Sequence, residues 1–402
     1  MKPNWAMLAT TFVSRELYIP TRTRVRQWGT LPGDRGPTVL ITNHQHEDEG
    51  ETVVRRTWLL HPWKPLVVVN SRRTFEKGFF AARFPRTAPL LRNFNPGGFF
   101  GGLAVLPVEN MLFSRPFTSL AQEILDAHGD LPLEQILPED ILARLGLAGA
   151  RLAELWSAKW FLRAQAIVKL SQLREPYRSE ALANCRTTAA NDIAAVVERV
   201  RSGATFYVTP EGDYSRTGRM HRLRRGILDA VLPVAEAWLC AIAYDPFRGR
   251  RLSMLYRILQ PEDPSDLDAS LAAARPVTTS AVLAPFLLET VGGSFTLSDA
   301  VWGARERLLA LPANVFVDPE LRRAPAVVVA EAVAKLAKHG TLALEGERYR
   351  LTDRRANPRF PHIADMVSFQ SNMLDETIAA ARRLTRERRS EALGSEAHAR
   401  LG

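Results

Sequence analysis

The chain has 402 residues, of which 46% are hydrophobic and 24% are charged. This composition allows a large core and excludes wholesale disorder. Lys and Arg number 53 against 43 Asp and Glu, and the resulting net charge of +10 favours anionic partners. Nucleic acid, anionic lipid surfaces and phosphorylated or CoA-like ligands all satisfy that charge, and a solvated surface without an electrostatic partner remains an alternative.

Only two cysteines occur, Cys185 and Cys240, and they are far apart. A disulfide scaffold and a zinc finger are therefore not expected, and a reducing compartment is favoured. The N-terminal sequence has no secretory pattern. The most apolar window, residues 226–244, contains Asp229, Pro233 and Glu236, so no membrane span is expected and any membrane contact is peripheral.

The first part of the chain predicts an α/β domain. Residues 1–36 form a mixed lead-in that ends in the turn-rich sequence LPGDRGP. Short apolar runs predict buried strands at 38–42 (TVLIT), 65–70 and 101–109, and helical spacing predicts helices at 49–60 and 74–84. This alternation favours a mixed sheet flanked by helices, with ligand sites at the carboxyl ends of its strands.

A helical insertion is predicted at 111–185, where apolar residues recur at helical spacing. A helix at 188–203 follows and is closed by Gly203. We then expect a strand at 204–210, a loop at 211–226, a helix at 227–238, and strands at 239–246 and 251–261. The insertion thus lies inside an α/β domain that spans 37–275.

The C-terminal region, 285–402, has the outline of a winged-helix-like module. It contains predicted helices at 296–311 and 324–340 and a hairpin at 341–352. Nucleic-acid binding through Arg348 and Arg350 of the hairpin is one interpretation. The presumed recognition helix has few cationic residues, so we expect a structural or partner-docking role and no nucleic-acid partner. The basic helix at 371–393 rests on anionic lipid or is simply solvated.

The sequence VLITNHQHEDEGE, residues 39–51, concentrates two histidines and several acids after a strand. One interpretation is a metal site of the HxHxD type, with His44, His46 and Asp48, although Glu49 stands where a further histidine would be expected. The other is an acid–base pair in which Glu49 or Asp48 holds one imidazole nitrogen of His44. A solvated acidic helix N-terminus is the plainest alternative.

A second motif, FYVTPEGDYSR at 206–216, also ends a predicted strand. Pro210 and Gly212 mark a turn, at which Glu211 and Arg216 can face a ligand. Further arginines follow in the same loop and form a positive surface that suits phosphate. A salt-bridged loop without a ligand is the alternative.

Together, TNHQHEDE and VTPEGDYSR resemble the conserved blocks of the glycerolipid acyltransferase family, which includes glycerol-3-phosphate and 1-acylglycerol-3-phosphate acyltransferases. Asn43, His44 and Glu49 match the first block, with Glu in place of Asp, and 209–212 match the core of the third block. The segments 64–80 and 101–110 look like the family's second strand and second block, and 239–246 like its fourth. The resemblance spans about residues 35–260.

The resemblance implies a mechanism in which His44 is the general base and Glu49, or Asp48, orients it. It also implies that an acyl group moves from CoA or acyl carrier protein to an acceptor hydroxyl. The arginine of the second block is replaced by Asn110, for which Arg115 or the Arg72–Arg73 pair could compensate, and the third-block arginine is displaced to Arg216. The residues that would bind substrate are Asn43, Glu211, Gly212, Arg216, Arg72, Asn110 and Arg115.

We therefore expect an O-acyltransferase of phospholipid biosynthesis that acts on a glycerol phosphate or lysophospholipid. It would need no metal or cofactor besides the thioester co-substrate. We expect it in the cytoplasm, peripheral on the inner face of the membrane. The alternatives are a catalytically degenerate acyltransferase-like lipid-binding or scaffold protein and, less favoured, an HxHxD metallohydrolase. The sequence does not determine the acceptor, the acyl chain length, the donor or the oligomeric state.

Overall fold

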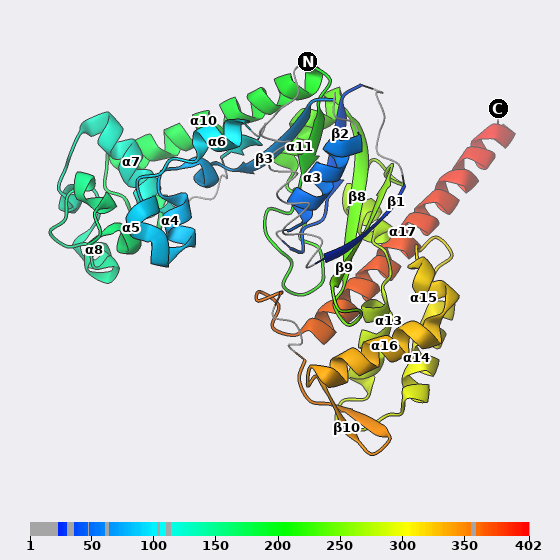
Figure 1. Ribbon diagram of the computed structural model, residues 1–402. Helices are drawn as coiled ribbons and strands as arrows, with labels where there is room; N and C mark the ends of the chain where they lie inside the picture. Colours follow the sequence, from blue (N-terminus) through cyan, green and yellow to red (C-terminus); the bar gives the residue numbers. More distant parts are fainter. Residues whose placement is uncertain are drawn as a thin grey trace. The chain divides into compact units, whose positions relative to one another are not determined.

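The computed structural model describes residues 23–29, 36–46, 48–60, 64–102, 105–109, 114–354 and 359–401 (Figure 1). These residues form an α/β protein in which helices flank a sheet of mixed parallel and antiparallel strands. The chain divides into two compact units. The first is built on Leu8–Leu66 and Gly203–Gly402, and the second mainly on Val67–Ser202.

The sheet strands of the first unit lie in the order β1-β9-β8-β2-β7. Strand β2 pairs in parallel with both β7 and β8, β8 pairs antiparallel with β9, and β9 pairs in parallel with β1. Every residue of β2 is buried, as expected for a continuous β-branched run with strands on both sides. The strands are β1 (Thr23–Trp28), β2 (Thr38–Thr42), β7 (Thr205–Val208), β8 (Glu236–Asp245) and β9 (Leu252–Leu259).

The helices of the first unit include a long C-terminal helix that packs along two buried helices, α12 and α13 (Figure 1). Side-chain caps begin four helices of this unit: Asp266 for α12, Thr278 for α13, Thr296 for α14 and Asp318 for α15. An antiparallel hairpin, β10 (Leu342–Glu345) and β11 (Arg348–Leu351), follows α16. The helices are α3 (Asp48–Leu60), α11 (Arg225–Val231), α12 (Leu267–Ala274), α13 (Thr279–Glu289), α14 (Leu297–Leu309), α15 (Pro319–Arg323), α16 (Pro325–Lys338) and α17 (Met366–Leu401).

The second unit contains the parallel pair β3 (Leu66–Ser71) and β4 (Val105–Val108), and the antiparallel pair β5 (Ser114–Pro116) and β6 (Ile167–Lys169). Its core is a cluster of apolar side chains contributed largely by the predicted insertion. The helices are α4 (Phe79–Arg83), α5 (Ala88–Leu91), α6 (Gly97–Gly102), α7 (Phe117–His128), α8 (Glu139–Leu145), α9 (Phe161–Ala164) and α10 (Tyr177–Arg201).

The predicted strands are confirmed as β2, β3, β7, β8 and β9, and the predicted hairpin as β10 and β11. Of the strand predicted at 101–109, β4 covers only Val105–Val108, and Gly101 and Gly102 belong to the end of α6. Residues 1–36, predicted as a lead-in, contribute strand β1 to the sheet. The predicted helix at 227–238 is wrong in its second half, because α11 ends at Val231 and β8 begins at Glu236. Pro233 follows the end of α11, where it cannot donate a helical hydrogen bond.

None of the helices in the described part of the chain is long and apolar enough to cross a membrane.

Candidate active site

The two sequence motifs meet at one edge of the sheet in the first unit. Because β2 and β7 are parallel neighbours, their carboxyl ends lie at the same edge. The segment 43–46 leaves β2 there and the loop after β7 begins there. The Ser215 amide donates to the His44 carbonyl at 3.2 Å, so the two loops are joined directly through their backbones.

His44 and Glu49 form a close pair at this edge. Nδ1 of His44 lies 2.9 Å from Oε2 of Glu49, and the imidazole keeps 20% of its side-chain surface exposed while the carboxylate is fully buried. Nε2 of His44 has no hydrogen-bonding partner among the described residues. This arrangement fixes one ring nitrogen on a carboxylate and leaves the other for a ligand, as a general base requires.

The Glu49 carboxylate also organises the loop that carries His44. Its oxygens accept hydrogen bonds from the backbone amides of Gln45, at 2.9 and 3.0 Å, and of His46, at 2.9 Å. Burial raises the pKa of Glu49, and the hydrogen bond to His44 opposes that rise. Glu49 therefore holds both the ring of His44 and the backbone that follows it. Asp48, its rival, is the first residue of α3, and its side chain lies outside the described part of the structure.

Glu211 contacts the backbone behind His44. One carboxylate oxygen accepts from the His44 amide at 2.6 Å, and the other accepts from the His221 amide at 2.8 Å. The side chain is 3% exposed, and burial raises the pKa of Glu211 to about 7 against the pull of these two amides. The carboxylate therefore links the two motif loops, and each of its oxygens already accepts a hydrogen bond from a backbone amide.

The side chain of Asn43 is likewise hydrogen-bonded to the backbone. Its amide nitrogen donates to the Ile242 carbonyl at 3.0 Å, and its oxygen accepts from the Ile242 amide at 2.7 Å. The side chain is buried and extends the β2–β8 ladder by one reciprocal pair. Asn43 thus fixes where the strand ends and the loop with His44 begins.

Aromatic side chains that were not singled out from the sequence surround the histidines. The Tyr214 ring lies 4.2 Å from the His44 ring and 5.2 Å from the His362 ring, measured between centroids. His46 directs Nε2 to the Arg359 carbonyl at 3.0 Å and packs against the Phe360 ring. Burial lowers the pKa of His362. The segment that carries Arg359, Phe360 and His362 is remote in sequence, and no local pattern marks it.

The other predicted residues differ in position. Gly212 adopts a φ of +76°, a left-handed conformation that favours glycine, and a Cβ there would lie 2.4 Å from the guanidinium carbon of Arg224, so that side chain would have to move. Arg216 is exposed in the same loop as Tyr214. Arg72 and Arg115 belong to the second unit.

Arg72 forms an ion pair with Asp192, and Arg115 forms ion pairs with Glu109 at 3.3 Å and Glu123 at 2.6 Å. Asp192 also accepts from the Glu109 amide at 2.9 Å. These contacts make a charged network within the second unit, with each arginine already matched by an acid. Asn110 lies outside the described residues.

Within the described ranges, no group of three or more His, Cys, Asp or Glu side chains is placed to hold a metal ion.

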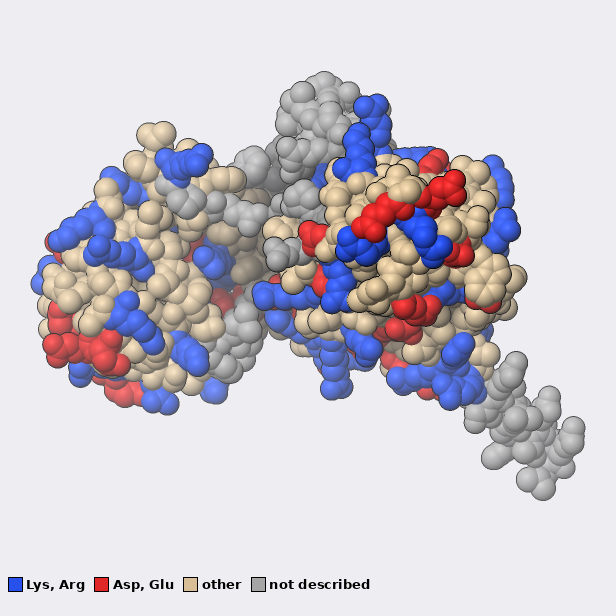
Figure 2. All heavy atoms as spheres, turned by 90° about the horizontal axis from the view of Figure 1, so that it is seen from below, with Lys and Arg blue, Asp and Glu red and all other residues tan. Residues whose placement is uncertain are grey.

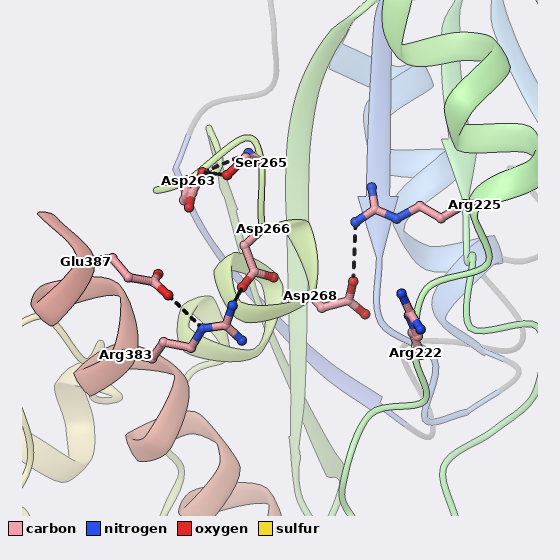
Figure 3. A pocket seen from close by; sticks show the side chains of 8 residues that line it. All are labelled: Arg222, Arg225, Asp263, Ser265, Asp266, Asp268, Arg383 and Glu387. Atoms are coloured by element: carbon pink, nitrogen blue, oxygen red, sulfur yellow. Dashed lines mark hydrogen bonds and ion pairs between the residues drawn. The ribbon is translucent and has the colours of Figure 1, made fainter. Parts of the chain in front are cut away.

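A polar cavity of about 630 Å³ opens between the loop before α11, the start of α12, and α17 (Figure 3). Its arginines are partly matched by carboxylates: Arg383 pairs with Asp266 at 2.5 Å, and Arg225 lies 3.7 Å from Asp268. The wall therefore carries both signs of charge. The lining residues are Arg222, Arg225, Asp263, Ser265, Asp266, Asp268, Arg383 and Glu387.

Basic and acidic side chains are interspersed over both parts of the surface seen in Figure 2. On that face the net charge of +10 is not gathered into a single continuous basic surface. Any electrostatic attraction for an anionic partner must then come from local groups of arginines.

No known protein-family model matches this chain, and a search of curated proteins finds no similar sequence.

Proposed function

We propose that this protein is an O-acyltransferase that moves a fatty acyl group from a thioester to an acceptor hydroxyl. The observation that carries the proposal is the His44–Glu49 pair, 2.9 Å apart, with Nε2 of His44 unpartnered among the described residues. The resemblance of the two motifs to glycerolipid acyltransferases supports the choice of reaction. Their meeting at one edge of the sheet supports treating them as one site.

In the proposed reaction, Nε2 of His44 takes the proton of the acceptor hydroxyl, and the oxygen attacks the thioester carbonyl. The C–S bond then breaks, and the thiolate receives the proton from the imidazolium. An ester and a free thiol result. Glu49 stabilises the imidazolium through Nδ1–H and fixes the tautomer in which Nε2 is the acceptor.

Glu211 has a positioning role in this proposal. Its carboxylate holds the His44 and His221 amides, so it sets the path of both loops. The acceptor would be a glycerol phosphate or a lysophospholipid, and the donor acyl-CoA or acyl carrier protein. Arg216, exposed beside Tyr214, is the described arginine that we assign to the phosphate of the acceptor.

The proposed setting is the cytoplasmic face of a membrane, with the protein attached peripherally to anionic lipid. The positive net charge and the acyl chemistry support this setting. In the C-terminal region, helices α14 and α16 with the hairpin β10–β11 support a winged-helix-like module used for docking.

The HxHxD metallohydrolase is the competing proposal. The contacts of the His44 and His46 imidazoles distinguish it from the acyltransferase. Nδ1 of His44 lies against Glu49, whereas Nε2 of His46 lies against the Arg359 carbonyl. A metal site would need both histidines equally. In the acid–base site, His46 supports the loop and only His44 touches the reacting atoms.

The test is to incubate the protein with labelled acyl-CoA or acylated carrier protein and a panel of glycerol phosphate and lysophospholipid acceptors. We expect a labelled ester that His44→Ala abolishes and His46→Ala retains in part. Hydrolysis of the thioester without ester formation, stimulated by zinc in the wild type and lost equally in both variants, would favour the metallohydrolase. No ester with any donor would favour a lipid-binding or scaffold protein that has lost catalysis.

A further inference from the structure

One face of α14 exposes large apolar side chains to solvent. Trp302 is 63% exposed and Leu309 is 87% exposed. With Arg305 between them, these residues are spaced three and four apart, so they lie on one stripe of the helix. Large exposed apolar groups on a common face mark a surface that binds a protein, a membrane or a ligand.

An apolar hollow adjoins this stripe. It has a volume of about 470 Å³, within the range of roughly 300–1,000 Å³ typical of ligand sites. It is formed by the last turn of α14, the segment 311–317 and the helices α15 and α16. The lining residues are Arg305, Leu308, Leu309, Leu311, Pro312, Ala313, Val315, Val317, Arg322 and Pro325.

The only charged groups that line the hollow are two arginines, among the residues described there. Arg305 and Arg322 are exposed, and neither forms an ion pair within the described structure. By contrast, the neighbouring Arg307 pairs with Glu289 at 2.5 Å. The hollow therefore combines an apolar wall with two unmatched positive charges, which complements an amphiphile with an anionic head.

We propose that the Trp302–Leu309 stripe of α14 and the adjoining hollow dock onto an anionic phospholipid surface. Trp302 and Leu309 enter the interfacial region, where indole rings are favoured, and Arg305 and Arg322 meet lipid phosphates. A second copy of this chain fits less well, because a two-fold contact would bring the same arginines together. A free fatty acid in the hollow would leave Trp302 exposed.

This inference rests on the proposed attachment to an anionic membrane, but not on the chemistry at His44. It adds the surface that makes the contact, which lies on α14 and the adjoining hollow rather than on the basic tail of α17. Since Trp302, Leu309 and Arg322 are exposed, replacing them should leave folding intact.

The test is sedimentation of the full chain with vesicles made of equal parts phosphatidylcholine and phosphatidylglycerol. We expect the wild type to bind and the Trp302→Ser/Leu309→Ser double variant to bind at least about tenfold more weakly. Arg322→Gln should weaken binding about fivefold. The matched control is Arg323→Gln, which removes the same charge from a neighbouring exposed residue that does not line the hollow.

Vesicles of phosphatidylcholine alone, or high salt, should reduce binding by the wild type. The inference is overturned by a wild type that stays in solution, or by variants that bind as tightly as the wild type. It is also overturned if Trp302→Ser/Leu309→Ser abolishes self-association or the capture of a protein, with vesicle binding unchanged. The wild type could bind vesicles, with the variants binding more weakly, and yet show no acyl transfer. That result would contradict the proposed function and support the docking surface.

Discussion

Glu211 provides a sharp test of the site, because it is a buried carboxylate whose pKa is raised from 4.5 to about 7 by burial. An acid with a raised pKa in the folded state binds its proton more tightly there than in the unfolded chain. The wild type therefore loses stability as pH rises through the window from 4.5 to about 7. Over that window the loss is roughly 3 kcal/mol.

Glu211→Gln removes this titration while keeping the size of the side chain. The difference in unfolding free energy, variant minus wild type, should rise by roughly 3 kcal/mol between acidic and mildly alkaline pH. The absolute level of that difference is set by a second effect. The amide group has one acceptor oxygen, so one of the two amides now held, on His44 and His221, loses its partner at about 1–3 kcal/mol.

The assay is chemical unfolding of both proteins across a pH series. Comparing them at each pH cancels every other titrating group. A difference in unfolding free energy that stays flat, or falls as pH rises, would refute the reasoning. It would mean that the two amide hydrogen bonds outweigh the effect of burial on the pKa of Glu211. The variant should also lose acyl transfer even where it is the more stable protein, because the loop with His44 is no longer held at both ends.

Three further substitutions test the packing around the site. Gly218→Ala should destabilise the folded protein by more than about 2 kcal/mol, because the added Cβ would lie 1.9 Å from the Phe369 carbonyl oxygen at a φ of +88°. The control is Gly340→Ala, which has a φ of +75° and open space around it, so it carries the backbone cost alone. Equal unfolding midpoints for the two variants would contradict the account. Arg275→Met should lower stability by about 3–5 kcal/mol in urea unfolding, since the guanidinium is 1% exposed and its carboxylate and carbonyl partners would be left unmatched; an unchanged midpoint would argue against that network. Glu49→Gln should lower the free energy of unfolding by about 1–3 kcal/mol and also lower the rate of acyl transfer. A variant with unchanged stability and an unchanged rate would show that Glu49 is not part of the site.

The strands that carry the site were predictable because their residues are buried on both faces. TVLIT and TFYV are unbroken β-branched and aromatic runs, and each is followed by a loop with chemically distinctive residues. The five-residue spacing of His44 and Glu49 is compatible with their pairing, but the sequence left Asp48 as an alternative partner, and the structure places Glu49 against Nδ1 of His44. Local pattern was sufficient for the strands but not for the choice of carboxylate.

The buried helices α12 and α13 were missed for the opposite reason. The sequence of α13, TSAVLAPFLLE, is apolar nearly all round and contains Pro285, so no amphipathic period appears. Strand β1, TRVRQW, is rich in polar residues, so its sequence predicts no more than part of a lead-in. Its place becomes clear only from its pairing with β9.

Within the site, the functions of Asn43 and Glu211 depend on partners remote in sequence. Asn43 pairs with the backbone of Ile242, and Glu211 with that of His44, so neither function can be read from spacing along the chain. The aromatic contacts of Tyr214 with His44 and His362 are equally non-local. Sequence reasoning found the residues of the motifs but not what holds them in place.

The most direct test of the central claim is the rate of acyl transfer in a single turnover, measured for the wild type and for His44→Ala with the same thioester and acceptor. General-base catalysis predicts a loss of about 10²–10⁴-fold in the variant, which should still unfold cooperatively because Glu49 keeps the amide donors of Gln45 and His46. A variant that transfers the acyl group at nearly the wild-type rate would contradict the assignment of His44 as the base.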